Sequence, residues 1–361
     1  MIRLLVVEDS TTVRKLLVSV FESDPQLSVV GTAESGEAAV QAVASLRPDV
    51  VTMDVNLPGM DGFEATRAIM SSFPVPVVIV TGKMDPKASG TLFRVMEAGA
   101  LMVLPKPEPP GSPGYERSVA DLVRHVKLMS EIKVVRRNFG RPPLPPPEPQ
   151  LPQLAPAAKE QIKVVAIGAS TGGPPLLREL MGQLPADFNA AVLVVQHMAE
   201  GFTEGFVHWL NQGSRLPVEL AVAGSPILPG RVYVAPDGCH LEAGPGSRIH
   251  LSSAPPDQGL RPSVSALFRS VALRYGKQAV GVLLTGMGTD GVDGLKCMRE
   301  QGAVTVAQDR ESSVVYGMPG SAVKAGAALY VLPPQGILKL LCGLVQPSPP
   351  PTIRSSTDAT R

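Results

Sequence analysis

The first part of the chain alternates short apolar runs with segments of helical periodicity. The apolar runs cover Ile2–Val7, Leu27–Thr32, Val50–Met53, Val75–Val80 and Leu101–Leu104. Amphipathic patterns such as Thr11–Glu22 and Glu37–Leu46 lie between them. Short β-rich runs that alternate with helices indicate βαβ units and a buried parallel sheet. We therefore predict a parallel five-stranded sheet, followed by one long amphipathic helix over Tyr115–Arg137.

Proline then becomes dense between Pro142 and Pro156. Proline removes backbone donors and disfavours helix, so we predict a semi-stiff linker of polyproline-II type. A second α/β pattern starts at Ile162–Ile167 and lasts to about Leu344. The residues from Gln346 onward are rich in Pro, Ser and Thr, and we expect them to be disordered.

These changes of pattern divide the chain of 361 residues into two α/β domains, in keeping with its length. The first domain is expected over residues 1–125, and the end of the long helix with the Pro-rich linker over 126–160. The second domain is expected over 161–345, and the tail over 346–361.

Composition narrows the possible functions. The net charge is +1, and we find no basic cluster with interleaved aromatic residues, so nucleic acid is not an expected partner. Three widely spaced cysteines, Cys239, Cys297 and Cys342, indicate neither a disulfide framework nor a metal knuckle. The N-terminus turns acidic too early for a signal peptide, and no apolar run could span a bilayer. We expect a cytoplasmic protein without membrane insertion.

Polar residues follow four of the apolar runs in the first domain. Asp9 closes the first run, Asp54 the third and Thr81 the fourth, and Lys106 comes just after the fifth. The carboxyl ends of strands in an open parallel sheet converge on one crevice. Any one of these residues could be an ordinary solvated loop residue, but four of them at one sheet edge predict a site.

The residue types at this edge fit phosphoryl transfer to a carboxylate. Glu8, Asp9 and Asp54 can hold Mg²⁺, which prefers a few carboxylates together with water and phosphate oxygens. Asp54 is the predicted nucleophile, because a carboxylate can accept a phosphoryl group as an acyl phosphate. Lys106 and the Thr81 hydroxyl are expected to contact the phosphate oxygens.

The second domain opens with a strand and a glycine-rich turn around Ser170. The segment Gly168–Gly172 fits G-x-S-x-G, and Pro174 and Pro175 suit the first turn of a helix. The turn lacks the second glycine of a dinucleotide fingerprint and the Gly-Lys-Ser/Thr of a P-loop. Ser170 as a nucleophile is the leading interpretation, and a glycine turn without chemistry is the alternative.

A serine nucleophile needs a base, and four histidines are available in this domain. His197 follows an apolar run and lies at the carboxyl end of a predicted strand, as Ser170 does. His240 is its main competitor. His208 lies in a helical pattern, and His250 lies inside an alternating strand pattern that favours a structural role.

The base needs an orienting acid. The run Val280–Leu284 reads as a buried strand that leads into a glycine-rich turn ending at Asp290 and Gly291. Asp290 is thus a third polar residue at a strand's carboxyl end. Asp293 and Asp309 are the alternatives, and each could equally be a surface or capping residue.

The first domain strongly resembles the receiver domains of two-component signalling over about residues 1–125. The resemblance rests on Asp9, Met53–Gly62, Thr81 and Pro105–Pro107, and it implies a flavodoxin-like strand order with Mg²⁺ at the acidic cluster. One position departs from the pattern. Receivers commonly carry an aromatic switch residue three positions before the lysine, where this chain has Val103. The usual Thr–aromatic rotation therefore cannot be its relay.

Both domains together resemble the chemotaxis-type protein-glutamate methylesterases, often called CheB, over about residues 1–345. The motifs that carry this resemblance are Gly168–Gly173, Gln196–Met198, Arg261–Val264, Leu284–Gly291, Gln308–Asp309 and Gly317–Pro319. It implies a doubly wound α/β esterase as the second domain. The family usually has Asp after Arg261–Val264, where this chain has Ser265, and this puts a local cap or contact in doubt.

The resemblance implies a Ser170–His197–Asp290 triad without a cofactor in the esterase site. It further implies that the Met287 backbone N–H helps to bind the oxyanion, and that Thr171 belongs to the active site. The implied reaction is hydrolysis of glutamate γ-methyl esters on chemoreceptors, with deamidation of receptor glutamine.

The resemblance also implies control by a chemotaxis-type histidine kinase as phosphodonor. We expect the unphosphorylated receiver to cover the active-site face and phosphorylation to loosen it. Two other readings fit the same residues: an output domain that binds a partner without catalysis, and a serine esterase that acts on another ester.

Overall fold

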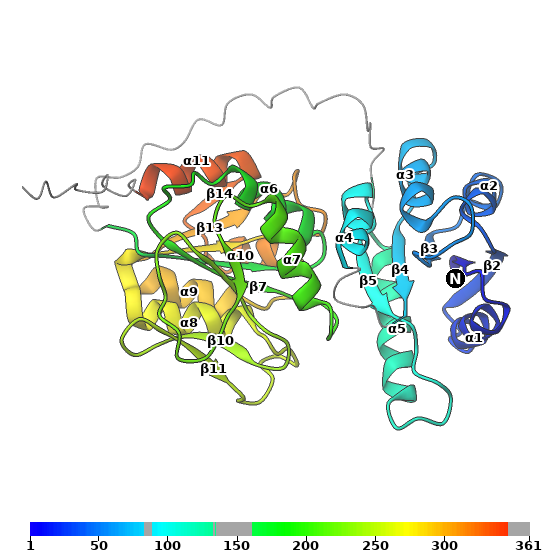
Figure 1. Cartoon of the computed structure of the whole chain (residues 1–361), viewed down its shortest axis with the longest axis horizontal. Helices are drawn as coiled ribbons and strands as arrows, with labels where there is room; N and C mark the ends of the chain where they lie inside the picture. The colour runs from blue at the N-terminus through cyan, green and yellow to red at the C-terminus, as the bar shows by residue number, and fades with distance from the viewer. Residues whose placement is uncertain (83–88, 133, 135–160, 346–361) are drawn as a thin grey trace, which may run out of the picture.

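The computed structural model describes residues 1–82, 89–132, 134 and 161–345. Most of the predicted Pro-rich linker and the predicted tail over 346–361 lie outside these residues. The described chain forms two α/β units, each built on a parallel sheet (Figure 1).

The first sheet has five parallel strands in the order β2-β1-β3-β4-β5. They are β1 (Ile2–Val7), β2 (Leu27–Ala33), β3 (Val50–Met53), β4 (Val77–Thr81) and β5 (Met102–Pro105). This is the flavodoxin-like order, so the predicted fold of the first domain is confirmed. The inner strands β3 and β4 are buried along their whole length, as their predominantly apolar sequences indicate.

Helices cover both faces of this sheet. Its helices are α1 (Thr11–Glu22), α2 (Gly36–Leu46), α3 (Gly62–Ser72), α4 (Ser89–Ala98) and α5 (Tyr115–Ser130). One apolar cluster lies between the sheet and α1 with α5, and another lies on the opposite face. Polar side chains begin three of these helices: Ser10, Ser35 and Asp61 each accept a backbone N–H at a helix start.

Helix α5 ends at Ser130, so it is shorter than the helix predicted over Tyr115–Arg137. Beyond it, Ile132 and Val134 pack against the apolar cluster beneath α1 and α5. Both side chains are partly buried there, and as β-branched residues they contribute little helix propensity.

The second sheet has seven strands in the order β14-β13-β12-β6-β7-β9-β8. They are β6 (Val164–Ala169), β7 (Ala191–Gln196), β8 (Val218–Leu220), β9 (Val232–Val234), β12 (Ala279–Leu283), β13 (Val304–Gln308) and β14 (Tyr330–Leu332). All pairings are parallel. The strand β6 comes first in the chain and lies between β7 and β12, which makes the carboxyl end of β6 a topological switch point.

This sheet is doubly wound. Its helices are α6 (Gly173–Gln183), α7 (Thr203–Gly213), α8 (Val264–Tyr275), α9 (Val292–Glu300), α10 (Met318–Lys324) and α11 (Pro334–Leu344). Helices α6, α7 and α11 cover one face, and α8, α9 and α10 cover the other (Figure 1). An antiparallel hairpin of β10 (His240–Gly244) and β11 (Arg248–Ser252) packs beside α8.

The two units meet where α4 of the first lies against α6 and α7 of the second (Figure 1). Phe93, which is 2% exposed, stacks on Trp209 with ring centroids 5.3 Å apart and packs against Phe206 at 5.6 Å. The guanidinium of Arg178 lies 4.4 Å from the Trp209 ring centre, and its Nε is 3.2 Å from a carboxylate oxygen of Glu97. An aromatic cluster with an ion pair at its edge thus joins the units.

Two loops of the second domain also contact the first. Met287 and Val314 pack against the apolar cluster that lies between the first sheet and helices α1 and α5. Both loops also pass close to the turn that carries Ser170.

Among the helices of the described ranges, none combines the length and the apolar character that a bilayer crossing requires.

The burial of α8 generates a stability prediction. Leu267 is fully buried in the second domain and Leu273 on the same helix is 76% exposed. Leu267→Ala should lower the free energy of unfolding by about 2–5 kcal/mol, since it opens a cavity in the core. Leu273→Ala should change it by less than about 0.5 kcal/mol. Denaturant unfolding followed by the fluorescence of Trp209, the single tryptophan, measures both. Equal losses in the two variants would contradict the assigned burial.

Candidate functional site

Sheet order and register bring the three predicted triad positions together. Ala169 pairs with Gln196 across β6 and β7, so Ser170 and His197 leave neighbouring strands side by side. The His197 N–H donates to the Ala169 carbonyl at 2.9 Å. On the other side of β6, the Ser170 N–H donates to the Thr285 carbonyl at 3.0 Å, just before the loop that leads to Asp290.

Ser170 lies on a tight turn between β6 and α6. Its side chain is 8% exposed, and Gly172, two residues later, has φ +80°, which a residue with a side chain rarely adopts. Gly286 passes so close that an added Cβ would lie 2.7 Å from the Cβ of Ser170. The glycines around Ser170 therefore allow the backbone of a second loop to approach the hydroxyl.

His197 and Asp290 are hydrogen-bonded. Nε2 of His197 lies 2.9 Å from Oδ2 of Asp290, whose side chain is 1% exposed. When Nε2–H donates to the carboxylate, the lone pair of the neutral ring is on Nδ1. Nδ1 is thus the nitrogen that can accept a proton from a serine hydroxyl.

Ser170 and His197 have adjacent backbones but are not joined through their side chains. Within the described residues, the Ser170 hydroxyl forms no hydrogen bond, and Nδ1 of His197 forms none either. Catalytic hydrogen bonds are often long or poorly aligned in the absence of substrate and tighten when it binds. Two of the three predicted members are therefore in contact, and the third lies at the adjacent strand end.

The surroundings of Asp290 favour its ionised form. Burial alone would raise the pKa of Asp290. The hydrogen bond and charge of His197, with the backbone N–H groups of Ser265 and Val264, outweigh burial and hold that pKa well below its usual range. A carboxylate that stays charged can stabilise an imidazolium beside it.

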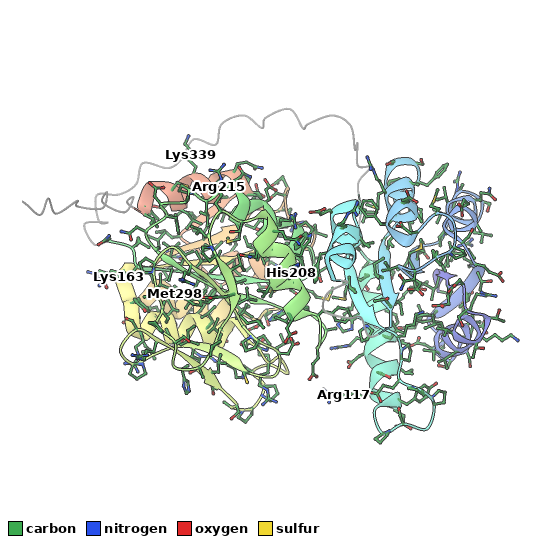
Figure 2. All side chains as sticks on the ribbon, in the orientation of Figure 1. Arg117, Lys163, His208, Arg215, Met298 and Lys339 are labelled. Carbon is green, nitrogen blue, oxygen red and sulfur yellow. The ribbon has the colours of Figure 1, made fainter. Side chains whose placement is uncertain are left out.

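The competing histidines have other roles in the structure. His240 is buried; its Nδ1 accepts the Ser263 N–H at 3.2 Å, and its Nε2 lies 3.2 Å from the Pro255 carbonyl. With both ring nitrogens engaged away from Ser170, His240 has no free nitrogen to act as its base. His208 lies on α7 beside Gln212 (Figure 2), and His250 is exposed in the β10–β11 hairpin.

The competing acids also lie elsewhere. Asp309 accepts the Ser312 N–H at 3.0 Å, which is a local capping contact. Asp293 is exposed in the first turn of α9. Of the three candidates, only Asp290 bonds to a histidine.

Two buried glutamines that the sequence analysis placed in motifs without a role support the Ser170 turn. Gln196 closes β7, and its Nε2 donates to the carbonyls of Ser170 at 2.9 Å and His197 at 2.8 Å. Gln308 closes β13, and its Oε1 accepts the Thr285 N–H at 2.7 Å. Both are polar residues at strand carboxyl ends, the same signal that identified Ser170 and His197.

Backbone donors are available next to Ser170. In the described chain, the N–H groups of Thr171 and Met287 make no hydrogen bond. Thr171 directly follows Ser170, and its carbonyl is fixed by the Thr285 hydroxyl at 2.9 Å. Met287 follows Gly286, whose carbonyl accepts the Met318 N–H at 2.8 Å. Free N–H groups on two sides of a hydroxyl are suited to binding an oxyanion.

The predicted phosphorylation site gathers at the carboxyl edge of the first sheet. Glu8, Asp9 and Asp54 each offer a carboxylate oxygen, and these oxygens lie within 4.8 Å of one another. Lys106 Nζ lies 2.7 Å from both Glu8 and Asp54. Thr81 is buried beside them, and its carbonyl accepts the Lys106 N–H at 2.8 Å.

The charges at this edge are not balanced. Burial raises the pKa of Glu8, and the charge of Asp54 adds to that rise, while Lys106 offsets only part of it. Burial would lower the pKa of Lys106, but its hydrogen bonds to Asp54 and Glu8 raise it. One ammonium thus faces three carboxylates, a donor set with excess negative charge that a divalent cation fits.

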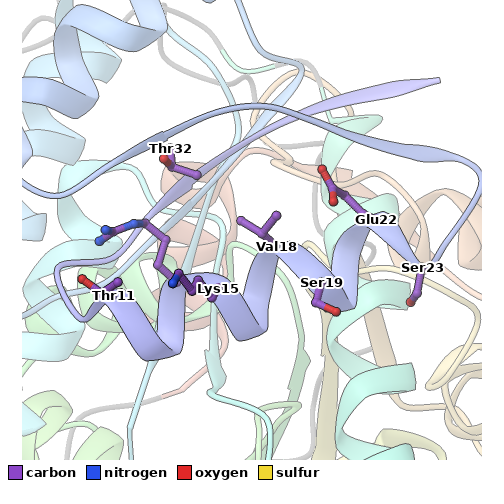
Figure 3. Close-up of a pocket in the computed structure, with 8 residues that line it drawn as sticks. Thr11, Lys15, Val18, Ser19, Glu22, Ser23 and Thr32 are labelled. Carbon is purple, nitrogen blue, oxygen red and sulfur yellow. The ribbon is translucent and has the colours of Figure 1, made fainter.

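A separate cavity of about 560 Å³ lies along α1 (Figure 3). Its lining includes Arg14, Lys15, Glu22 and Thr32 but none of the predicted site residues. It therefore belongs to neither site.

The fold defines a response regulator receiver joined to a doubly wound α/β domain with serine, histidine and aspartate at one sheet edge. Two family models match it. The model of the response regulator receiver domain matches residues 4–112, and the model of the CheB methylesterase matches residues 165–341.

Relatives match both domains at once. The protein-glutamate methylesterase/protein-glutamine glutaminase 4 of Geobacter metallireducens is 52% identical over 345 residues, which cover 95% of this chain and 99% of that one. Enzyme 1 of the same name from Syntrophus aciditrophicus is 50% identical over 346 residues, covering 95% and 98%. The crystal structure of the Thermotoga maritima CheB methylesterase catalytic domain is 39% identical with a TM-score of 0.50, and the match covers 52% of this chain and 100% of that one. The chain belongs to the CheB family of protein-glutamate methylesterase response regulators.

The lowered pKa of Asp290 predicts how the stability depends on pH. A carboxyl whose folded-state pKa is depressed stabilises the protein above its ordinary pKa of 3.8, and this contribution is lost as pH falls through the lower folded-state value. Asp290→Asn should therefore cost about 1–3 kcal/mol of unfolding free energy at neutral pH, and less as the pH falls below about 4.

Denaturant unfolding of the full chain at several pH values measures this difference. Asp293→Asn is the matched control, because Asp293 is exposed on a neighbouring helix. A penalty for Asp290→Asn that grows toward acid pH would contradict the assigned direction of the pKa shift.

Proposed function

We propose that this chain hydrolyses glutamate γ-methyl esters on chemoreceptors with Ser170 as nucleophile, His197 as base and Asp290 as the orienting acid. The observation that carries the proposal is the His197–Asp290 hydrogen bond of 2.9 Å, which leaves Nδ1 as the free nitrogen next to the Ser170 turn. The relatives are named protein-glutamate methylesterase/protein-glutamine glutaminase, which supports methyl esters of protein glutamate as substrate and extends the activity to protein glutamine. That the protein is a chemoreceptor is part of the proposal.

The reaction follows from these positions. The Ser170 hydroxyl rotates toward His197, loses its proton to Nδ1 and attacks the ester carbonyl. Asp290 stabilises the imidazolium that results. The imidazolium then protonates the departing methoxide, methanol leaves, and an acyl-enzyme remains on Ser170. Water, deprotonated by His197, then attacks the acyl-enzyme ester. The imidazolium returns this proton to the departing Ser170 Oγ, and the glutamate leaves as its carboxylate.

Glutamine can use the same route. Attack on a γ-carboxamide releases ammonia in place of methanol, and both substrates converge on the same acyl-enzyme. Hydrolysis of that intermediate gives glutamate from either one.

The oxyanion that forms during attack needs donors, and two are near. Among the residues that the structure describes, the N–H groups of Thr171 and Met287 are unpaired, and they lie on two different loops next to Ser170. Removing one oxyanion donor typically costs about 2.7–4 kcal/mol of transition-state stabilisation. A displacement of the Met287 loop would therefore slow the reaction even with the other residues in place.

The receiver is the proposed control element, and Asp54 is its proposed phosphorylation site. Glu8, Asp9 and Asp54 would hold Mg²⁺, which when bound neutralises charge on the transferred phosphoryl group. Lys106 and Thr81 would contact the phosphate oxygens. A chemotaxis-type histidine kinase is the proposed phosphodonor.

The contact between the domains supports inhibition by the unphosphorylated receiver. Met287 and Val314 both pack against the receiver, and both border the Ser170 turn. Val314 lies so close to Gly172 that a Cβ there would be 2.6 Å from it. These contacts support the proposal that the unphosphorylated receiver restricts the site through loops that lie next to Ser170.

The aromatic contact at α4 is the proposed link from phosphorylation to opening. Val103 has no ring to swing inward when Thr81 meets a phosphate. Phe93 lies on α4, the helix that follows Thr81 in the chain, and it is buried against Trp209. Movement of α4 on phosphorylation would withdraw this ring and loosen the domain contact.

The first test concerns the nucleophile. Ser170→Ala should abolish release of methanol from methylated receptor fragments and labelling by a fluorophosphonate probe, with the fold unchanged. Asp54→Asn is the control and should keep its basal activity and its labelling. Labelling of the wild type without methanol release would favour an esterase with another substrate. If Ser170→Ala demethylates at the normal rate, the proposed nucleophile is wrong.

The second test concerns control. Phe93→Ala should raise activity without any phosphodonor, because loss of a buried ring removes about 3 kcal/mol or more from the closed state. Inverting a population from 99:1 to 1:99 takes about 5.5 kcal/mol, so we expect partial activation. The emission of Trp209 should shift to longer wavelength in this variant, and in the wild type with a small phosphodonor. Asp54→Asn should show neither response to the phosphodonor. Unchanged basal activity in Phe93→Ala would contradict the role of this contact.

A further inference from the structure

The carboxylate of Asp290 is held by more groups than the triad includes. Its Oδ2 accepts the Val264 N–H at 2.7 Å in addition to the bond with His197. Its Oδ1 accepts the Ser263 hydroxyl at 2.9 Å, the Ser265 N–H at 2.9 Å and the Gly291 N–H at 2.8 Å. Each oxygen accepts at least two hydrogen bonds, and three of the five donors come from the single turn Ser263–Ser265.

We propose that Ser263 is a positioning residue for the hydrolysis: its hydroxyl fixes the rotation of the Asp290 carboxylate, so that Oδ2 faces His197. The inference rests on the proposed function, since it concerns the aspartate of that triad. Ser263 is fully buried in the closed structure and touches Asp290 on the side away from His197.

The direction of the Ser263 hydroxyl bond is determined by its other contact. Ser263 is the N-cap of α8, and its Oγ accepts the Ala266 N–H at 3.3 Å. A hydroxyl has a single proton, and because the Asp290 carboxylate is ionised this proton is donated to Oδ1. The same atom thus begins the helix and holds the acid.

The first turn of α8 also holds the Asp290 carboxylate in place. Val264 and Ser265 are its first residues, and N–H groups in the first turn have no partner within a helix. Here both donate to Asp290, so the positive end of the helix faces the carboxylate. The backbone N–H groups stabilise the charge, and the Ser263 hydroxyl is the only side-chain donor to Oδ1 among the described residues.

The backbone of Ser263 is also held in place by its own contacts. Its N–H donates to Nδ1 of His240, and the opposite nitrogen of that ring bonds the Pro255 carbonyl. On the other side, Val264 packs so closely against Gly168 that an added Cβ there would lie 2.2 Å from it. The turn Ser263–Ser265 therefore has little freedom to shift when substrate binds or the receiver moves. The buried His240 holds it in place through the hydrogen bonds of its two ring nitrogens.

This arrangement predicts a particular kinetic effect. Without the hydroxyl, Oδ1 keeps only its backbone donors, and the carboxylate can rotate out of the plane that aligns the imidazole. Because Ser263 does not contact Ser170, its loss should lower kcat and leave KM nearly unchanged. Loss of one hydrogen bond to a charged group predicts a decrease of about 10- to 100-fold in kcat.

The experiment compares four variants in the full chain activated by a small phosphodonor. Ser263→Ala and Ser263→Gly both remove the hydroxyl, and glycine preserves the helix start, since a glycine N-cap costs little. Ser263→Thr restores it. Ser270→Ala is the matched control, because Ser270 lies on the same helix and its hydroxyl accepts the Ala243 N–H away from Asp290. Methanol release gives kcat and KM, and proton NMR follows the ring N–H of His197.

The expected result is a loss in kcat for Ser263→Ala and Ser263→Gly, with KM within about twofold of the wild type. The His197 ring N–H signal should shift or broaden in both variants. Ser263→Thr should recover most of the activity, and Ser270→Ala should match the wild type in both measurements.

Two results would overturn the inference: wild-type kcat in both Ser263→Ala and Ser263→Gly, or an equal loss in Ser270→Ala. Failure of the proposed function looks different, because the wild type would then release no methanol. In that case the His197 signal decides: a change confined to the variants without the hydroxyl supports the positioning role, and an unchanged signal refutes it.

Discussion

The hydrogen bond between His197 and Asp290 is the interaction on which the rest of the second domain depends. It joins residues that are far apart in the chain, and it exists because β7 and β12 flank the same central strand, β6. A buried carboxylate is costly unless donors surround it. The turn at the start of α8 supplies three of these donors, so the packing of that helix also determines how the charge of Asp290 is stabilised.

Buried carboxylates also determine the properties of the site in the first domain. Three carboxylates at one sheet edge repel one another, and Lys106 compensates only part of that charge. Such a donor set favours a divalent cation. Its surroundings connect to the second domain through α4, where Phe93 is buried between Trp209 and Phe206. Interfaces between the domains of one chain are of the size that a few kcal/mol can reorganise.

The interface and the active site share their loops. Gly286 brings one loop against Ser170, and the next residue, Met287, carries a free N–H while its side chain packs on the receiver. Val314 likewise lies between the Gly172 turn and the receiver. Because one loop holds both a contact with the receiver and a candidate oxyanion donor, the proposed separation of the domains would act on the geometry of the site.

The sequence by itself determined both fold types and most of the candidate residues. Apolar runs located the strands of the first sheet to within two residues, and the rule that polar residues close parallel strands identified Asp54, Ser170 and His197. That rule works because backbone hydrogen bonding puts the carboxyl ends of parallel strands at one edge whatever the side chains are. Gln196 and Gln308 also close strands, but their roles depend on neighbours that the pattern does not show, and the sequence assigned them none.

Only the tertiary structure decided between alternatives that look equal in the chain. His240 and His197 both follow strand-like runs, and it is the burial of His240 against Ser263 that removes it as a base. The end of α5 at Ser130, the Phe93–Trp209 stack and the contact of Ser263 with Asp290 likewise arise from long-range packing. Local sequence fixes periodicity and turn chemistry, whereas the partner of a buried polar group is chosen by which strands and helices come together.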